Sequence, residues 1–282
     1  MASPSSASAW SWSIADLYRY ASSLRDPRTE GWGGVADTKF VLPLLLGYVY
    51  FAKVAGPRWM KGRQPFDLRW AVLTYNALNV VANAYFAVRV FQSTYLGGRY
   101  SFLCQGINYH SPTAADMDIL SLGWWYSLIR IADFVDTVFF VLRKKFSQVS
   151  FLHLVHHFLV VLSAWFYMHF GADGQPMLGL CVNAFVHVVM YSYYFLAALG
   201  PSVRKHLWWK RYITQLQIAQ FVGLMSHMAI TFFYDCGYPR PLAVIALLQG
   251  SFVLALFVNF YVSCYVRRNK AKIRGDGTSK RD

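Results

Sequence analysis

Charge and cysteine are both scarce in this sequence. Charged residues make up only 14% of the chain, whereas a soluble globular domain carries roughly a quarter. The 4 cysteines are too few to build a disulfide scaffold. These two shortages argue against an ordinary soluble domain and against a small secreted fold that depends on disulfides.

Apolar residues are correspondingly abundant. Hydrophobic residues make up 56% and aromatic residues 18% of the 282 positions. A membrane-spanning helix needs about 20 mostly apolar residues. Seven segments approach that pattern, at 40–55, 70–91, 119–142, 152–170, 177–199, 212–234 and 242–266. We therefore predict an all-α, polytopic membrane protein with seven transmembrane helices, a single domain over residues 1–282, and the lipid bilayer as its surroundings.

The basic residues are distributed unevenly between alternate loops. The net charge is +14, and most Lys and Arg residues fall in the C-terminal tail and in one set of loops, as Arg63, Lys144 and Arg204 illustrate. Lys and Arg favour cytosolic loops. We therefore expect residues 1–38 to form a luminal N-terminal segment and residues 267–282 a cytosolic basic tail. This topology explains the charge, so we expect no nucleic-acid partner.

Two cysteines fall in loops on the predicted far side. Cys104 lies in "FLCQG" and Cys236 lies in "YDCGY". If that side is an oxidising lumen, these two residues can pair. Cys181 and Cys264 lie within or at the end of predicted spans, where packing is the expected role.

The third predicted span carries an unusual group of polar residues. In "RIADFVDT", Arg130, Asp133, Asp136 and Thr137 are three or four residues apart, which places them on one face of a helix. Ionisable residues are costly inside a membrane and commonly mark functional sites. The alternative interpretation is an ion pair that only stabilises the helix bundle.

Three histidines open the fourth predicted span, in "FLHLVHHFLVV". One interpretation makes His153, His156 and His157 metal ligands. The other makes one imidazole a nucleophile or base that its neighbours orient. Of the 8 histidines, His206 falls in a predicted cytosolic loop, and only these three and His187 fall within spans at cytosolic depth. Adjacent side chains on a helix also point about 100° apart, so we favour the site without a metal.

Two further spans carry polar side chains at helical spacing. They are Asn183, His187, Tyr191 and Tyr194 in the fifth span, and Thr214, Gln217 and Gln220 in the sixth. Taken alone, the tyrosines suit aromatic packing and the glutamines suit hydrogen bonds between helices. The predicted topology nevertheless places these groups at the same depth as the histidines. We therefore predict one polar chamber that opens to the cytosol.

The ordered motifs resemble those of one known family. "RIADFVDT", "HLVHH", "NAFVHVVMYSYY" and "TQLQIAQ", together with "RQPFDLRWAVLTYN" before them, resemble the ELO family of very-long-chain fatty acid elongases over residues 65–268. The resemblance implies an endoplasmic reticulum 3-oxoacyl-CoA synthase, which condenses a long-chain acyl-CoA with malonyl-CoA and releases CO2 and CoA. It also implies that six of the seven helices form an inverted barrel around an acyl-chain tunnel.

The resemblance further implies roles for individual residues. His156 corresponds to the acyl-accepting nucleophile, His187 to a histidine beside the reacting carbons, and Cys104 with Cys236 to a luminal disulfide. No metal or other cofactor is implied. We expect His153, His157, Asp133 and Asp136 to orient the nucleophile, and Asn183 with Gln217 to hold the oxyanion. The expected substrate contacts are Arg130, Thr137, Tyr191, Tyr194, Thr214 and Gln220.

Expected partners follow from the same resemblance. They are a ketoacyl-CoA reductase and the other enzymes of the elongation cycle, and a homodimer is compatible with the family. Two alternative functions stay open at this point. A histidine-box, metal-dependent lipid desaturase or hydroxylase is the first. A seven-span transporter is the second, although the chain lacks the repeated, broken helices that many transporters share.

Overall fold

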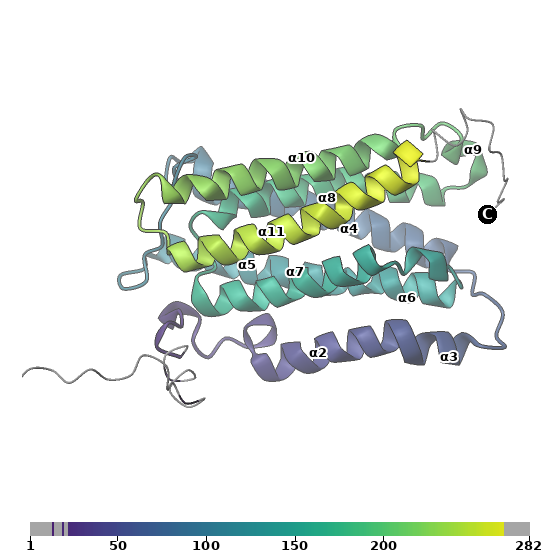
Figure 1. Cartoon of the computed structure of the whole chain (residues 1–282), viewed down its shortest axis with the longest axis horizontal. Helices are drawn as coiled ribbons and strands as arrows, with labels where there is room; N and C mark the ends of the chain where they lie inside the picture. Colours follow the sequence, from purple (N-terminus) through teal and green to yellow (C-terminus); the bar gives the residue numbers. More distant parts are fainter. Residues whose placement is uncertain (1–12, 14–18, 20–21, 268–282) are drawn as a thin grey trace, which may run out of the picture.

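The computed structural model describes Ser13, Arg19 and residues 22–267. Most of the predicted luminal segment before residue 22, and the predicted basic tail beyond residue 267, lie outside the described residues. Figure 1 shows an elongated bundle of helices that run along its longest axis. Within the described residues the bundle contains no strand, as the all-α prediction requires.

The long helices follow one another along the chain with short connections. They are α2 (Thr38–Tyr50), α4 (Arg69–Phe91), α5 (Ala114–Ala132), α6 (Phe134–Leu142), α7 (Phe151–Phe170), α8 (Pro176–Ala198), α10 (Lys210–Ala229) and α11 (Arg240–Tyr261). Short turns of π-helix, at Phe51–Ala55, Gln92–Leu96 and Val262–Arg267, lengthen α2, α4 and α11. The short helices α3 (Gly56–Met60) and α9 (Pro201–Arg204) lie in or beside connections.

Among the residues that the structure describes, five helical segments are long and apolar enough to cross a membrane. They are Thr38–Met60, Arg69–Leu96, Phe151–Phe170, Pro176–Ala198 and Arg240–Arg267. Large apolar side chains on their outer faces are exposed, among them Leu46, Leu78 and Leu248. Such exposed apolar surface suits contact with lipid. The chain therefore has the character of a multi-pass membrane protein.

The other two predicted spans differ from this pattern, so the count of seven stays a prediction. The segment predicted at 119–142 is divided at Asp133 into α5 and α6. Helix α10 has the length of a span, but polar residues such as Gln217 and Gln220 interrupt its apolar face. Both segments nevertheless run along the bundle beside the more apolar helices (Figure 1).

Six helical elements contact one another in a closed order. Helix α4 packs on α8, α8 on α10, α10 on α11, α11 on α7, α7 on α5, and α5 on α4. Helix α2 lies outside this sequence of contacts and packs against α7. Its buried residues Val41 and Leu45 belong to the same apolar core as Val141 of α6 and Val161 of α7. Each of these side chains, when fully buried, contributes about 1.5–3 kcal/mol to folding.

Local capping fixes where two of the site-bearing helices begin. Thr113 and Asp116 form a capping box at the start of α5, in which each side chain accepts from the other residue's backbone N–H. Ser150 caps α7, because its hydroxyl accepts from the backbone N–H of His153 at 3.2 Å. Helix starts strongly favour such residues. The cap of α7 therefore places the histidines in the first two turns of that helix.

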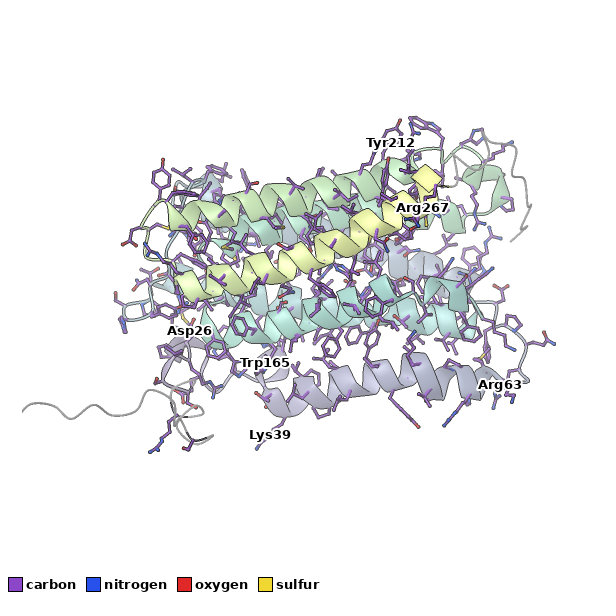
Figure 2. The ribbon with its side chains drawn as sticks, in the orientation of Figure 1. Asp26, Lys39, Arg63, Trp165, Tyr212 and Arg267 are labelled. Atoms are coloured by element: carbon purple, nitrogen blue, oxygen red, sulfur yellow. A yellow bond between two sulfur atoms is a disulfide. The ribbon has the colours of Figure 1, made fainter. Side chains whose placement is uncertain are left out.

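The two ends of the bundle carry different residues. Figure 2 shows Lys39, near the start of α2, at one end, and Arg63 and Arg267 at the other. The second end also holds α9, the start of α7 and the start of α10 (Figure 1). The loops predicted to be cytosolic thus gather at one end of the molecule. The direction of the bundle relative to a membrane stays a prediction.

Candidate functional site

An interhelical charge cluster forms where α5 ends. The guanidinium of Arg130 lies 3.1 Å from the Asp133 carboxylate, and both side chains are buried. A second nitrogen of Arg130 donates to Oδ1 of Asn83 on α4 at 2.7 Å. Buried charges require both a partner and hydrogen bonds. The buried charges of this cluster are therefore compensated by groups within it. The cluster lies among α4, α5 and α8.

His187 of α8 joins this cluster. Its ring nitrogens contact the Arg130 guanidinium, with Nε2 at 3.0 Å. Its Nδ1 lies 4.0 Å from the Asp133 carboxylate. The sequence predicted that Arg130, Asp133 and His187 would share one chamber, and the structure places their side chains in direct contact.

A tyrosine bridges the two carboxylates of the third predicted span. The Tyr191 hydroxyl lies 2.9 Å from Asp133 Oδ1 and 2.7 Å from Asp136 Oδ2. The Tyr75 hydroxyl of α4 lies 3.4 Å from that of Tyr191 and donates to the Ala132 carbonyl at 3.2 Å. Tyr191 is fully buried, so its role is to connect charged groups in the interior rather than to form an interfacial belt.

The three histidines at the start of α7 face different surroundings. His153 Nε2 lies 2.7 Å from the Thr137 hydroxyl, which in turn lies 3.0 Å from the Tyr48 hydroxyl of α2. The rings of His153 and His157 are 4.4 Å apart between centroids. The ring of His156 instead stands edge-on to Phe257 of α11, at 5.5 Å. The His156 ring therefore points away from the hydrogen-bonded side chains of Thr137 and Tyr48, which hold His153.

The Nδ1 atom of His156 is buried and has no hydrogen-bond partner. Buried ring nitrogens are usually paired, and each exception calls for an explanation. His156 is one of the residues that line a pocket of about 150 Å³, and most of the others come from α7 and α11. The further lining includes Phe221, Ser163, Gln249 and Tyr167. An imidazole with a free nitrogen in the wall of an apolar pocket is suited to react with a group at the end of an apolar chain.

The remaining predicted residues meet different partners. Asn183 Oδ1 accepts from the Tyr126 hydroxyl at 2.8 Å, which identifies its other amide atom as the donor. Gln217 Nε2 donates weakly to the Met190 sulfur at 3.6 Å. Thr214 and Gln220 are buried, whereas Tyr194 is 40% exposed. Gln220 Oε1 has no partner. The bonds of Asn183 and Gln217 are thus made to residues other than Arg130, Asp133 and His187.

No three side chains of the His, Cys, Asp or Glu type are grouped so as to hold a metal ion, within the residues that the structure describes. Metal sites in proteins bring three or more such ligands to one point. The histidines of α7 instead engage Thr137 and aromatic rings. The described residues therefore offer no grouped set of metal ligands, and the absence of a metal stays a prediction.

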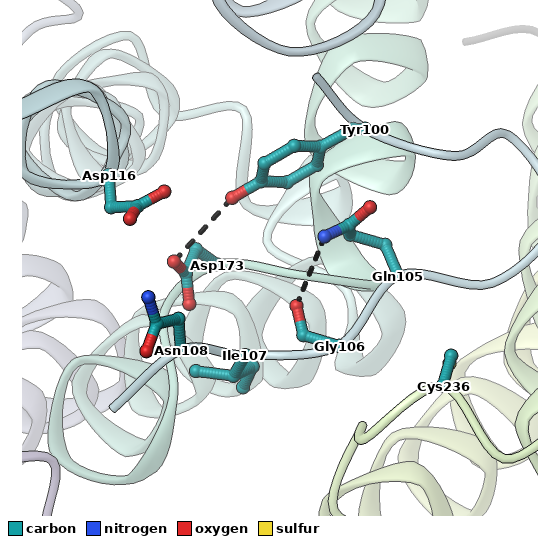
Figure 3. A pocket seen from close by; sticks show the side chains of 8 residues that line it. All are labelled: Tyr100, Gln105, Gly106, Ile107, Asn108, Asp116, Asp173 and Cys236. Carbon is teal, nitrogen blue, oxygen red and sulfur yellow. Dashed lines mark hydrogen bonds between the residues drawn. The ribbon is translucent and has the colours of Figure 1, made fainter. Parts of the chain in front are cut away.

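A second pocket lies at the other end of the bundle. Figure 3 shows Tyr100, Asp116 and Asp173 around this pocket of about 240 Å³. Arg28 pairs there with the carboxylates of Asp26 and Asp173, at 2.7 and 2.8 Å. Burial raises the pKa of the Asp173 carboxyl, and the bonds from Arg28 oppose that rise. The Cys104–Cys236 disulfide closes the same end of the molecule.

Two residues of the site escaped prediction from the sequence. Asn83 and Tyr48 were not singled out, although Asn83 bonds Arg130 and Tyr48 bonds Thr137. A signal existed for the first, because Asn79 and Asn83 repeat at helical spacing within an apolar span. No signal existed for Tyr48, since a tyrosine in an apolar span usually packs.

Comparisons with known proteins identify the family. Residues 35–273 match the model of the ELO: GNS1/SUR4 family. This match covers most of the chain, and the chain belongs to that family.

Similar proteins carry consistent names. A very long chain fatty acid elongase of Aedes aegypti is 40% identical over 252 residues, which cover 89% of this chain and 70% of that protein. Very long chain fatty acid elongase 4 of Homo sapiens is 37% identical over 257 residues, covering 91% and 81%. Very long chain fatty acid elongase 7 of Rattus norvegicus is 39% identical over 246 residues, covering 86% of each chain.

Proposed function

We propose that this protein catalyses the condensing step of fatty acid elongation. A long-chain acyl-CoA and malonyl-CoA react to give a 3-oxoacyl-CoA two carbons longer, CO2 and CoA. The observation that carries this proposal is the unpartnered Nδ1 of His156, a residue that lines an apolar pocket. The names of the similar proteins, all fatty acid elongases, support the class of substrate.

The arrangement of helices supports a tunnel for the acyl chain. We propose that the closed order of contacts among α4, α8, α10, α11, α7 and α5 is the wall of an inverted barrel. The pocket beside His156 is then one section of its interior. Apolar walls exclude water, which protects a reactive acyl intermediate from hydrolysis.

In the first step, His156 accepts the acyl group. An unprotonated ring nitrogen attacks the thioester carbonyl, so a C–N bond forms and the C–S bond breaks. The proton on the other ring nitrogen passes to the departing CoA sulfur. The products are an acyl-imidazole on His156 and free CoA. The hydrogen bonds that link His153 to Thr137 and Thr137 to Tyr48 fix the ring of His153, and thus the start of α7.

In the second step, malonyl-CoA loses CO2 and its carbanion attacks the acyl carbonyl. A C–C bond forms, the C–N bond to His156 breaks, and a proton from solvent restores the imidazole. Negative charge develops on the acyl oxygen during this attack, and fixed donors lower its energy. The amide of Asn183, oriented by Tyr126, is a donor of this kind. Arg130 and His187 provide positive potential and a ring N–H nearby.

The test of this proposal is an acyl adduct. The purified protein is incubated with palmitoyl-CoA alone, and mass spectrometry of its peptides should find the added acyl group on His156. His156→Ala should abolish formation of 3-oxoacyl-CoA, because no other imidazole borders the pocket in the described structure. His206→Ala, which changes an exposed histidine outside the site, should retain activity.

Several outcomes would contradict the mechanism. Near-normal activity of His156→Ala would remove the covalent role. Loss of activity in Cys181→Ala with an adduct on that thiol would transfer the role to Cys181, whose thiol lies 3.4 Å from the Ala87 carbonyl. Stoichiometric iron or zinc in the active protein would favour a desaturase or hydroxylase.

The cellular setting is part of the proposal. We propose residence in the endoplasmic reticulum membrane, with a luminal N-terminus and a cytosolic C-terminus. The basic loops that gather at one end of the bundle support this direction. In that setting a ketoacyl-CoA reductase and the later enzymes of the cycle would take up the product, and basic loop residues would attract the phosphates of CoA.

A further inference from the structure

A row of three hydrogen-bonding side chains joins α2, α6 and α7. The Tyr48 hydroxyl of α2 lies 3.0 Å from the Thr137 hydroxyl of α6, which lies 2.7 Å from Nε2 of His153 on α7. Both hydroxyl-bearing side chains are buried. The Tyr48 ring also stacks on that of Phe134, with 3.9 Å between centroids. The stacking fixes the direction of the Tyr48 hydroxyl, and burial limits the access of water to the row.

One arrangement of protons uses every hydroxyl in this row. A hydroxyl donates one hydrogen bond, and a neutral imidazole donates from one nitrogen and accepts at the other. If Tyr48 donates to Thr137 and Thr137 donates to Nε2 of His153, both hydroxyl protons are used. If Nε2 of His153 carries the proton instead, Thr137 accepts it, and the proton of one of the two hydroxyls has no acceptor within the row.

The surroundings offer no substitute for that missing acceptor. Within the described part of the chain, Thr137 is the hydrogen-bond partner of the Tyr48 hydroxyl, and the nearby Asp136 carboxylate accepts from Tyr191. A buried donor without a partner is costly. Nδ1 of His153 is not a buried atom without a partner, so it favours neither arrangement. The row therefore favours the tautomer of His153 that carries its proton on Nδ1.

We propose that Tyr48 is a positioning residue, which acts through Thr137 to hold His153 in the Nδ1–H tautomer. The ring of His153 lies 4.4 Å from that of His157, which lies 5.7 Å from that of His156. A fixed tautomer keeps the donor and the acceptor of the first ring in constant places beside these two. The effect on catalysis rests on the proposed function, whereas the tautomer is a property of the protein without substrate.

The test reads the position of the proton directly. The full chain is labelled with isotope-enriched histidine, reconstituted in lipid bilayers, and studied by solid-state NMR without substrate. A ring nitrogen that carries a proton resonates far from one that does not, so the two tautomers are distinguished. The sample is kept at about pH 8, above the usual imidazole pKa of about 6.5. The signals of His153 are those that disappear in His153→Asn, and in the parent protein they should show a proton on Nδ1 alone.

Tyr48→Phe removes the hydroxyl and keeps the ring that stacks on Phe134. The Thr137 hydroxyl is then free either to donate to His153 or to accept from it, so a second population with the proton on Nε2 should appear. Thr137→Val should produce the same mixture, because Nε2 loses its partner. Thr137→Ser keeps a hydroxyl at that position and should restore the single tautomer of the parent.

Tyr50→Phe is the matched control. Tyr50 also lies in α2, but its side chain is 58% exposed. The loss of its hydroxyl should leave the signals of His153 and the rate of condensation unchanged.

Steady-state kinetics test the consequence for catalysis. In Tyr48→Phe, kcat for condensation should fall by roughly threefold to tenfold, which is the effect of one hydrogen bond of ordinary strength. KM for palmitoyl-CoA should stay unchanged, because neither Tyr48 nor Thr137 lines the pocket beside His156. A general loosening of α2 would instead change both constants.

The outcomes separate this inference from the proposed function. A parent protein that forms no 3-oxoacyl-CoA contradicts the proposed function, while the NMR comparison still decides the tautomer. A proton on Nε2 of His153 in the parent overturns the inference, and so does a single Nδ1–H tautomer that persists in Tyr48→Phe. An equal change in Tyr50→Phe also overturns it. If Tyr48→Phe does not fold, the comparison of Thr137→Val with Thr137→Ser decides the question.

Discussion

At the scale of single residues, the guanidinium of Arg130 is the meeting point of three helices. It bonds Asn83 of α4 and contacts Asp133 at the end of α5 and His187 of α8. A buried guanidinium has five N–H donors to satisfy, and its Nε remains without a partner. The loss of one further acceptor therefore leaves a charged group poorly compensated in the interior.

Asn83→Leu should impair catalysis through this guanidinium. The substitution removes the acceptor of Arg130, and an unpaired group of this kind costs about 1–3 kcal/mol. We expect kcat for condensation to fall by roughly tenfold, since each 1.4 kcal/mol in the barrier is tenfold in rate. KM for the acyl-CoA should change little, because the Asn83 side chain contacts Arg130 and not the pocket. Steady-state kinetics measure both.

Asn79→Leu is the matched control for that variant. Asn79 is also buried in α4, but its amide donates to the Tyr75 carbonyl of the same helix, at 3.2 Å, and makes no bond to Arg130. The Asn79→Leu variant should therefore lose less kcat than the Asn83→Leu variant. Equal losses of kcat in the two variants would show that packing of α4, rather than the position of Arg130, controls the rate.

Sequence motifs predicted a shared chamber but not the contacts within it. Arg130, Asp133, His187 and Tyr191 were assigned to one chamber because charged residues are rare within spans, and they contact one another. Gln217 contacts the Met190 sulfur instead. The spacing of residues defines a helix face but not the rotation of that helix against its neighbours. It therefore cannot predict which side chains of different helices contact one another.

At the scale of elements, the interruption at Asp133 shapes the site. The apolar pattern predicted one continuous span, because its spacing does not change across the break. In the structure α5 ends at Ala132, and the Tyr75 hydroxyl donates to the Ala132 carbonyl. A carbonyl released at a helix end needs such a partner. The interruption thus provides a hydrogen-bond acceptor for Tyr75 of α4 beside the carboxylates of Asp133 and Asp136.

A second element depends on a close approach at Gly56. A Cβ placed on this residue would lie 2.7 Å from Cγ1 of Val141 and 2.8 Å from the Phe51 carbonyl oxygen. Gly56→Ala should therefore force α3 away from α6 and cost about 1–3 kcal/mol, as overpacking commonly does. Thermal unfolding in detergent should show a lower Tm.

Gly47 offers the comparison for this prediction. It lies in α2, in the same helical segment, and a Cβ there would meet nothing within 4 Å. Gly47→Ala should stabilise the helix by about 0.5–1 kcal/mol, because alanine loses less conformational freedom than glycine. If both variants changed Tm alike, the contact between α3 and α6 would not be the cause.

At the scale of the whole molecule, the end opposite the histidines is held by charge and by a disulfide. Arg28 joins the segment before α2 to Asp173 in the connection between α7 and α8. Cys104 joins the loop after α4 to Cys236 before α11. The sequence indicated the cysteine pair through topology, but it gave no reason to pair Arg28 with a carboxylate 145 residues away.

Arg28→Met should destabilise the protein strongly. It leaves the buried carboxylates of Asp26 and Asp173 without their cation, and removal of one member of a buried ion pair commonly costs about 3–5 kcal/mol. The variant should unfold at a clearly lower temperature, as measured by intrinsic tryptophan fluorescence in detergent. Arg25→Met changes an exposed arginine three residues earlier and should have little effect. A Tm of Arg28→Met equal to that of Arg25→Met would contradict the structural role of the ion pair.

The contacts at this end also constrain the order in which the chain matures during synthesis. Arg28 leaves the ribosome long before Asp173, and Cys104 precedes its partner by 132 positions. Helix α11 comes last among the helices that contact one another in a closed order, and it packs on both α10 and α7. The newborn chain must therefore hold Arg28 with Asp26 alone until Asp173 is made, keep Cys104 reduced until Cys236 is made, and leave the side between α7 and α10 open until α11 is inserted.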